Sequence, residues 1–389
     1  MSNIILPDDL SEWPLLDKEL HHINPSRVLG KNNILTLLMK LDRDTRFKFN
    51  MGYMVQQECC YPRFDLSNFL YNIKPNPIYD MLPDSNPKLR DFTEIADARA
   101  IELENRATIY ETVYLFWSGG IDSTMVLCAI LKNCSAAFRS KLVIVLNNNS
   151  IDEFPEMYQL HIRGKFTEAN TDDFIAGLIL HTNDALYLTG DIGDSIFGFD
   201  GFPTIDKMYP NLYKNSWVKN KDFLVSFFSK TTGNITAGKF LVDYVEESLV
   251  RSKIEVDTIY DFLWWINFNW GYNTGVYMNW RLGLVPPGLD ARKYMEENLF
   301  IFFNSKPFQN WAVASIGTNL RIGDTGSTHK KSAKQYIFDY TKDSEYFLNK
   351  LKEDSAPKNK QIYNNRMLVA VDTDYNFYYG PTGAEWLPK

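Results

Sequence analysis

One short segment combines two adjacent glycines, three hydroxyl side chains and a carboxylate, a set that suits phosphate binding. Its residues are Ser118, Gly119, Gly120, Ile121, Asp122, Ser123 and Thr124. Adjacent glycines let the backbone approach an anion closely and adopt positive φ angles, and the hydroxyl groups add hydrogen-bond donors. We call residues 118–124 the diglycine loop and predict that it binds the phosphates of a nucleotide.

Asp122 means that a phosphate bound to this loop needs a cation beside it, because a carboxylate repels phosphates unless a cation lies between them. Mg²⁺ is commonly bound by one or two carboxylates together with phosphate oxygens and water. We therefore predict that Asp122 is a magnesium ligand; the alternative is a simple tight turn in which Asp122 caps a helix. The loop is neither a Walker A motif, which needs a lysine after its glycines, nor the dinucleotide fingerprint G-x-G-x-x-G.

A second acidic segment follows another apolar run, and we call its residues 189–198 the acidic motif. It consists of Thr189, Gly190, Asp191, Ile192, Gly193, Asp194, Ser195, Ile196, Phe197 and Gly198. In open α/β sheets, ligands bind just beyond the carboxyl ends of the strands, which is where Asp191 and Asp194 are expected. The alternative is that both carboxylates cap a helix or are solvated in a turn.

The elements that must position these motifs alternate between strands and helices. Residues 112–117, 142–146 and 185–189 are continuous apolar runs of strand length, as in strands that are covered on both faces. Residues 122–132 and 171–181 have helical spacing of apolar side chains. This alternation predicts an α/β fold with a parallel sheet flanked by helices, and the helix from 122 directs its N-terminal N–H groups and positive dipole end at the phosphate.

A domain boundary is predicted near residue 90. Four prolines at 75, 77, 83 and 87 mark turns, and residues 91–106 then carry charges and helix formers at helical spacing. Residues 1–90 are therefore interpreted as a small N-terminal domain of unknown role, and residues 91–389 as the nucleotide-binding domain.

Bulk composition limits the partners. The net charge of −7 and pI near 5.4 give no general attraction to nucleic acid or to an anionic membrane. The four cysteines form no C-x-x-C pair, and no apolar run approaches the roughly 18 residues needed to cross a bilayer. We expect a cytoplasmic protein that acts on small molecules.

The diglycine loop in its strand–helix context resembles the PP-loop ATP pyrophosphatase superfamily. The acidic motif is similar to the pattern [ST]-G-[DE]-G-x-D-E-[LI]-F-G-G of the synthetase domain of asparagine synthetases. The resemblance covers 112 to about 340 and implies a five-stranded parallel sheet, ATP and Mg²⁺ as cofactors, and adenylation of a carboxylate with release of pyrophosphate. Ammonia or an amine would then displace AMP.

The resemblance also assigns roles to residues. It implies that Asp194 is the second magnesium ligand and that Asp191 lies near the acyl-adenylate. Residues 329–334, which contain Lys330, Lys331 and Lys334, resemble the lysine signature K-x-x-[LP]-[RK], so Lys330 or Lys331 would stabilise the negative charge that develops on the phosphates. The spacing to Lys334 favours Lys330; the alternative is that these are ordinary surface lysines.

Three positions depart from the family pattern and leave the substrate open: Ile192 and Phe199 replace glycines, and Ser195 replaces a glutamate. The leading hypothesis is an amide-forming ligase. Because the chain begins Met1-Ser2-Asn3 without the cysteine nucleophile of glutamine-dependent relatives, we expect ammonia from solution or a separate partner, or else an amine nucleophile.

Two alternatives remain. One is a base-modifying enzyme like 7-cyano-7-deazaguanine synthase, although no cysteine follows Cys134 to build the zinc cluster of that family. The other is a nucleotide-binding protein without turnover.

Overall fold

The computed structural model describes residues 83–170, 185–198, 206, 208–232, 235–271, 291–323, 329–350, 368–371 and 377–380. Most of the predicted N-terminal domain and the predicted helix at 171–181 lie outside the described residues. The chain divides into two compact units: Pro77–Lys214 and Thr258–Lys358 belong to one, and Asn215–Asp257 and Asn359–Lys389 belong, with Met1–Asn76, to the other. The predicted boundary at residue 90 stays a prediction.

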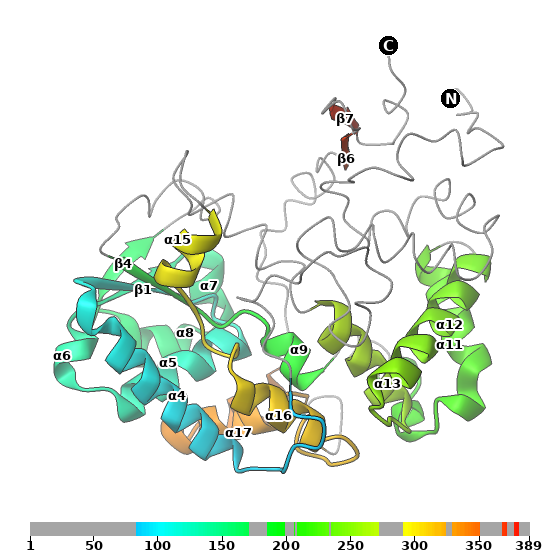
Figure 1. Cartoon of the computed structure of the whole chain (residues 1–389). Helices are drawn as coiled ribbons and strands as arrows, with labels where there is room; N and C mark the ends of the chain where they lie inside the picture. The colour runs from blue at the N-terminus through cyan, green and yellow to red at the C-terminus, as the bar shows by residue number, and fades with distance from the viewer. Residues whose placement is uncertain are drawn as a thin grey trace. The chain divides into compact units, whose positions relative to one another are not determined.

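A five-stranded parallel sheet forms the centre of the first unit (Figure 1). Its strand order is β3-β2-β1-β4-β5. The strands are β1 (Thr112–Phe116), β2 (Leu142–Leu146), β3 (Thr167–Asn170), β4 (Ala185–Thr189) and β5 (Leu299–Ile301). The predicted α/β fold with a parallel sheet flanked by helices is confirmed, and its strand order is consistent with a Rossmann-like or PP-loop fold.

The strand order places the two predicted motifs next to each other. From β1 the chain moves outward through β2 and β3 on one side, then returns to the other side of β1 for β4 and β5. The order therefore reverses between β1 and β4, and ligands of open α/β sheets bind at such a switch point, beyond the carboxyl ends of the strands. The diglycine loop follows β1 and the acidic motif follows β4.

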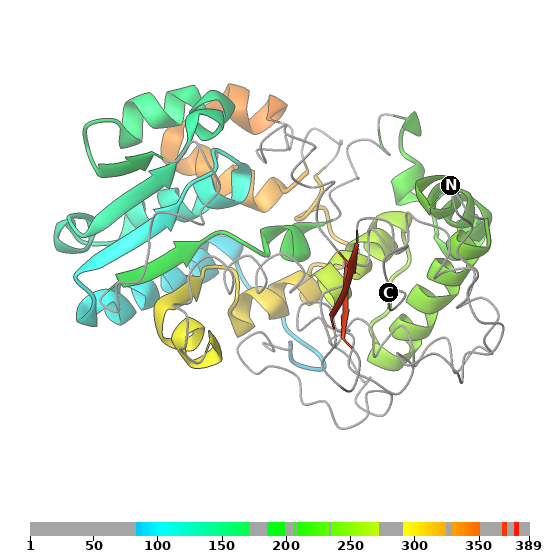
Figure 2. The same ribbon diagram turned by 90° about the horizontal axis from the view of Figure 1, so that it is seen from above.

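Helices cover the sheet, and its strands β2 and β4 are apolar on both faces. All five residues of β4 are buried, and β2 has one half-buried position. Helices α4, α5 and α17 pack side by side on one face, and α15 lies over β4 and β5 on the other (Figures 1 and 2). The helices of this unit are α4 (Phe92–Arg106), η2 (Ala107–Ile109), α5 (Ile121–Asn133), α6 (Ala136–Arg139), α7 (Asn148–Glu153), α8 (Pro155–Met157), η3 (Tyr158–Ile162), α9 (Gly193–Phe197), η4 (Leu212–Lys214), α13 (Ile259–Ile266), η6 (Asn267–Gly271), α15 (Ala291–Asn298), α16 (Lys306–Ala314), α17 (Lys331–Thr341) and α18 (Ser344–Asn349).

Arg99 ties α4 to the end of β5. Its side chain is 9% exposed, and its Nε and Nη2 donate to the backbone carbonyls of Phe302, Ile301 and Asn304 over 2.9 to 3.1 Å. These carbonyls lie where β5 turns into α16, so one buried guanidinium donates to three backbone acceptors of this turn.

The second unit is described over residues 215–232, 235–257, 368–371 and 377–380. Helices α11 (Lys221–Thr232) and α12 (Ile235–Ser252) follow a turn of 3-10 helix, η5 (Val218–Asn220), and pack against each other through buried apolar side chains at helical spacing, such as Val242, Val245 and Leu249. Strands β6 (Leu368–Val371) and β7 (Phe377–Gly380) form an antiparallel pair. Among the described residues, no helix is both long and apolar enough to span a bilayer.

Candidate functional site

The diglycine loop makes a tight bend that requires glycine. Gly119 has φ +76°, a left-handed conformation that side chains rarely adopt, and a Cβ there would lie 2.3 Å from the carbonyl oxygen of Ser150. Gly120 is the N-cap of α5, and no side chain caps the helix. The first N–H groups of a helix have no intrahelical acceptor, so this end of α5 is suited to an anion.

The hydroxyl groups of the loop hold its shape. The backbone N–H of Ser118 donates to Ser123 Oγ over 3.1 Å, and the two serine hydroxyls lie 3.0 Å apart. Thr124 is fully buried, and its hydroxyl accepts a hydrogen bond from Trp117 Nε1 over 3.1 Å. All three hydroxyls thus take part in bonds within the loop, since Ser123 Oγ also lies 3.2 Å from the carbonyl oxygen of Gly120 and Thr124 Oγ1 3.5 Å from that of Gly119.

The acidic motif leaves β4 through a strained turn. Thr189 Oγ1 accepts from the backbone N–H of Asp191 over 3.1 Å and donates to its carboxylate over 2.7 Å. Ile192 then adopts φ 63°, which is costly for a β-branched residue. Ile192 is also the position where the pattern that the acidic motif resembles has glycine, the residue that adopts positive φ most readily. Asp194 follows in the first turn of α9.

Two further glycines let the acidic motif approach α5. A Cβ on Gly190 would lie 3.0 Å from the carbonyl carbon of Asp122 and from the backbone nitrogen of Ser123. A Cβ on Gly193 would lie 2.4 Å from Asp122 Cγ, closer than real Cβ atoms come to a neighbour. Sequence reasoning did not identify Gly193 as a site residue, because its role depends on packing against a residue 71 positions earlier in the chain.

Lys330 connects the two aspartates. Its Nζ lies 2.5 Å from Asp122 Oδ2 and 2.6 Å from Asp194 Oδ1. The lysine side chain is 2% exposed, whereas the two carboxylates are 19% and 33% exposed. Burial alone would lower the pKa of Lys330, but the two carboxylates outweigh it and raise this pKa above its ordinary value. Lys330 is therefore a buried ammonium ion between two acidic side chains that come from different loops.

The backbone holds Lys330 in place at the start of α17. Lys330 has φ 61° and is the N-cap of α17. The N–H groups of the next two residues donate to the carbonyls of Arg321 and Leu320, each over 3.1 Å. Lys331 is half-buried at the first helical position, so of the two alternative lysines it is Lys330 that the described contacts bring to the aspartates.

A second buried lysine lies one turn further along α17. Lys334 is 1% exposed and donates to the carbonyl oxygen of Lys350. Burial, together with the charges of Lys330 and Lys350, lowers the pKa of Lys334 to about 8. Lys350 Nζ in turn lies 3.3 Å from a carboxylate oxygen of Glu153. Glu153 is a neighbour of the diglycine loop, because a Cβ added to Gly119 would lie 2.9 Å from the Cβ of Glu153. Cationic and acidic side chains thus flank the diglycine loop on this side as well.

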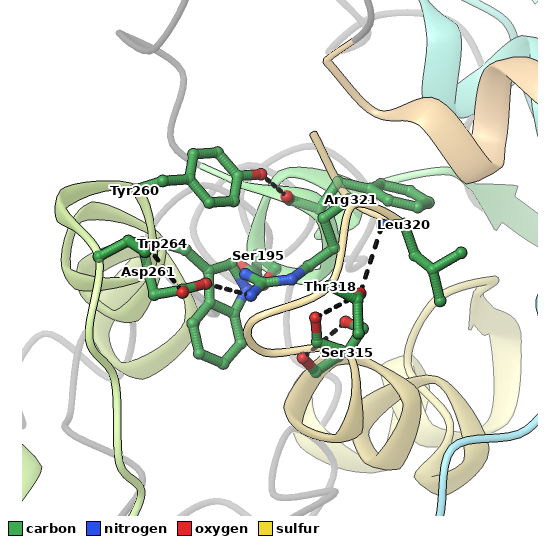
Figure 3. A network of polar contacts seen from close by, with 11 residues as sticks. Ser195, Tyr260, Asp261, Trp264, Ser315, Thr318, Leu320 and Arg321 are labelled. Carbon is green, nitrogen blue, oxygen red and sulfur yellow. Dashed lines mark hydrogen bonds and ion pairs between the residues drawn. The ribbon is translucent and has the colours of Figure 1, made fainter. Parts of the chain in front are cut away.

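A polar network supports the acidic motif from α13 (Figure 3). Trp264 Nε1 donates to the carbonyl of Ser195 over 3.1 Å, and Tyr260 donates to the carbonyl of Phe197. Arg321 stacks on Trp264 with its Cζ 4.3 Å from the ring centroid, and it forms a buried ion pair with Asp261. No periodic pattern or motif in the sequence indicates this network, which joins segments about 60 residues apart.

Taken together, the candidate site contains backbone N–H donors, two carboxylates and a buried ammonium at the switch point of the sheet. Within the described residues, no three His, Cys, Asp or Glu side chains group to hold a metal. Two carboxylates plus phosphate oxygens are a common way to bind Mg²⁺. The predicted roles of these residues stay predictions.

Comparison with known proteins does not assign the chain to a family. No protein-family model matches the sequence, and no curated protein matches it significantly.

Proposed function

We propose that the chain is an ATP-dependent, amide-forming ligase that adenylates a carboxylate and releases pyrophosphate. One observation carries this proposal: Asp122 and Asp194, from the loops after β1 and β4, converge on the buried Lys330 beside an uncapped helix N-terminus. The convergence lies at the switch point, where ligands of such sheets bind. The sequence resemblance to the synthetase domain of asparagine synthetases supplies the reaction type.

In the proposed reaction a carboxylate oxygen of the substrate attacks the α-phosphorus of ATP, and the bond from that phosphorus to the bridging oxygen breaks. The N–H groups of the diglycine loop and of α5 would hold the phosphates in place. The Lys330 ammonium would stabilise the negative charge on the α-phosphate and on the departing pyrophosphate. Mg²⁺ held by Asp122 and Asp194 would neutralise part of the phosphate charge.

In the second step an amine or ammonia attacks the acyl carbon, the bond to AMP breaks, and the nitrogen loses a proton. Asp191 is the proposed acidic group beside the acyl-adenylate, and the Thr189 hydroxyl that donates to its carboxylate orients it. The substrates would be a small-molecule carboxylate and an amine or ammonia. A cytoplasmic location is part of the proposal and is supported by the buried free thiols of Cys128 and Cys134.

Product analysis tests the proposal. The purified protein is incubated with MgATP labelled on the α-phosphate, a panel of carboxylic acids, and ammonia or amines. We expect AMP and pyrophosphate in equal amounts with one acid class, and loss of both products in Asp122→Asn and Asp194→Asn. ADP and phosphate as products, or pyrophosphate release that survives both substitutions together, would contradict the assignment.

A second candidate is a nucleotide-binding protein without turnover. Serine stands at position 195 where the pattern that the acidic motif resembles has glutamate, so this position offers a substrate no carboxylate. The Ser195 side chain is also only 3% exposed. In that case MgATP binds to the wild-type protein and is recovered intact with every acid in the panel.

A further inference from the structure

The position of the Lys330 ammonium bears on how a metal could reach this site. It bridges one oxygen of Asp122 and one of Asp194 at 2.5 and 2.6 Å. A metal ion that bridges these same two oxygens needs the place that the ammonium holds. The buried lysine is therefore an internal cation for the two aspartates, and it competes with any metal for them.

The net charge of the two aspartates and Lys330 decides when a metal ion can displace the lysine. Two carboxylates and one ammonium carry a net charge of −1, and a divalent ion added without an anion would leave a net positive charge around a lysine that is 2% exposed. Uncompensated charge in a buried position is strongly disfavoured. Phosphates change this balance, because they neutralise the added metal and also offer the ammonium new acceptors.

The exchange requires only a side-chain movement. Backbone hydrogen bonds from the two residues after Lys330 to the carbonyls of Leu320 and Arg321 fix the start of α17. Gly193 packs directly against the Asp122 carboxylate and limits its movement. The flexible part is the four-carbon side chain of Lys330, which can rotate from the aspartates to a phosphate while the loops stay in place.

We infer that Lys330 excludes free divalent cations from the Asp122–Asp194 pair, so that the metal enters only together with a nucleotide. This inference rests on the proposed function for the identity of the nucleotide. It makes metal binding depend on the nucleotide: the nucleotide phosphates draw the lysine away, and the metal occupies the position between the aspartates. Protein without nucleotide keeps its own cation there.

Mn²⁺ binding measured by electron paramagnetic resonance tests the inference without any turnover. The wild-type protein and Lys330→Met are titrated with Mn²⁺ alone, and then with Mn²⁺ and α,β-methylene-ATP, which cannot be cleaved between its α and β phosphates. Without nucleotide, Lys330→Met should bind one Mn²⁺ about tenfold or more tightly than the wild type, because a unit positive charge next to the metal has been removed. With the analogue, the wild type should gain at least the same factor.

Lys342→Met is the matched control. Lys342 is at the opposite end of the same helix, is also left-handed with φ 61°, and is exposed. Its loss removes the same charge from the chain and should leave Mn²⁺ binding at the wild-type level. The double variant Lys330→Met with Asp194→Asn should lose the tighter nucleotide-free Mn²⁺ binding that Lys330→Met alone shows.

Tight Mn²⁺ binding by the nucleotide-free wild type, equal to that of Lys330→Met, would overturn the inference. So would a gain that persists in the double variant with Asp194→Asn. Lys330→Gln is measured in parallel as a polar replacement, and the wild-type titrations with and without analogue test whether metal binding depends on the nucleotide even if neither variant folds. Failure to form AMP would contradict the proposed function but leave the Mn²⁺ result intact, so the two outcomes are distinguishable.

Discussion

Replacing Gly193 by alanine should destabilise the protein, although alanine is the better helix former. A Cβ at this position would lie 2.4 Å from Cγ of Asp122 and 2.6 and 2.7 Å from its two carboxylate oxygens. The carboxylate has little freedom to retreat, because Lys330 Nζ lies 2.5 Å from Oδ2. Either the ion pair lengthens or the turn before α9 shifts.

The magnitude follows from two opposing effects. Overpacking a close contact typically costs about 1 to 3 kcal/mol. Replacing glycine by alanine within a helix gains up to about 1 kcal/mol, and less at the first helical position. We therefore expect Gly193→Ala to lower the free energy of unfolding by about 1 to 2 kcal/mol.

A double-mutant cycle with Asp122→Ala, followed by urea unfolding, isolates the contact. Once the carboxylate is removed, the added methyl group has room, and Gly193→Ala should become neutral or slightly stabilising. Gly120→Ala is the control, since its Cβ would come no closer than 3.2 Å to a neighbouring atom. A Gly193→Ala cost that is the same with and without the Asp122 carboxylate would refute this reasoning.

Three further substitutions test other parts of the structure. Arg99→Leu removes the donor for three carbonyls in the 301–304 turn and should cost about 3 to 5 kcal/mol of unfolding free energy; a loss below about 1 kcal/mol would contradict the assigned contacts. Asp261→Asn leaves the buried Arg321 without its counter-charge and should cost about 3 to 5 kcal/mol in the same measurement, whereas a neutral effect would show that the pair is not buried in solution. Burial lowers the pKa of Lys334 to about 8 from an ordinary 10.5, so the folded protein binds fewer protons than the unfolded chain between these values and its stability should rise with pH there. Lys334→Met should remove that part of the rise, and parallel stability curves for variant and wild type between pH 8 and 10.5 would disprove it.

The sequence predicted the centre of the sheet well because buried strands leave an unambiguous apolar signal. The predicted runs at 142–146 and 185–189 match β2 and β4, and the run at 112–117 contains β1. The predicted helices at 122–132 and 91–106 correspond to α5 and α4 within one residue at each end. Helix caps and glycine turns at their boundaries explain this agreement.

The edge strands were missed for a physical reason. Strand β5 has only three residues and β3 has four, so neither shows a period that distinguishes a strand from a loop. Their pairing is set by the neighbouring strands and not by local preference. Short edge strands of this kind become visible only when the rest of the sheet is known.

The site was predicted in parts but not as an assembly. Asp122 was expected from the chemistry of its loop, and Asp194 and either Lys330 or Lys331 from the resemblance, yet the ion bridge that joins Lys330 to the aspartates depends on contacts across 208 residues of chain. The requirement for Gly193 and the support from Trp264 likewise arise from packing between distant segments. Motif spacing carries no information about such contacts.

A crystal structure with Mg²⁺ and α,β-methylene-ATP tests the central claim most directly. The account predicts phosphates on the N–H groups of the diglycine loop and of the first turn of α5, a metal between Asp122 and Asp194, and the Lys330 ammonium moved onto a phosphate oxygen. A nucleotide bound elsewhere, or one bound here with the lysine still bridging both aspartates, would contradict it.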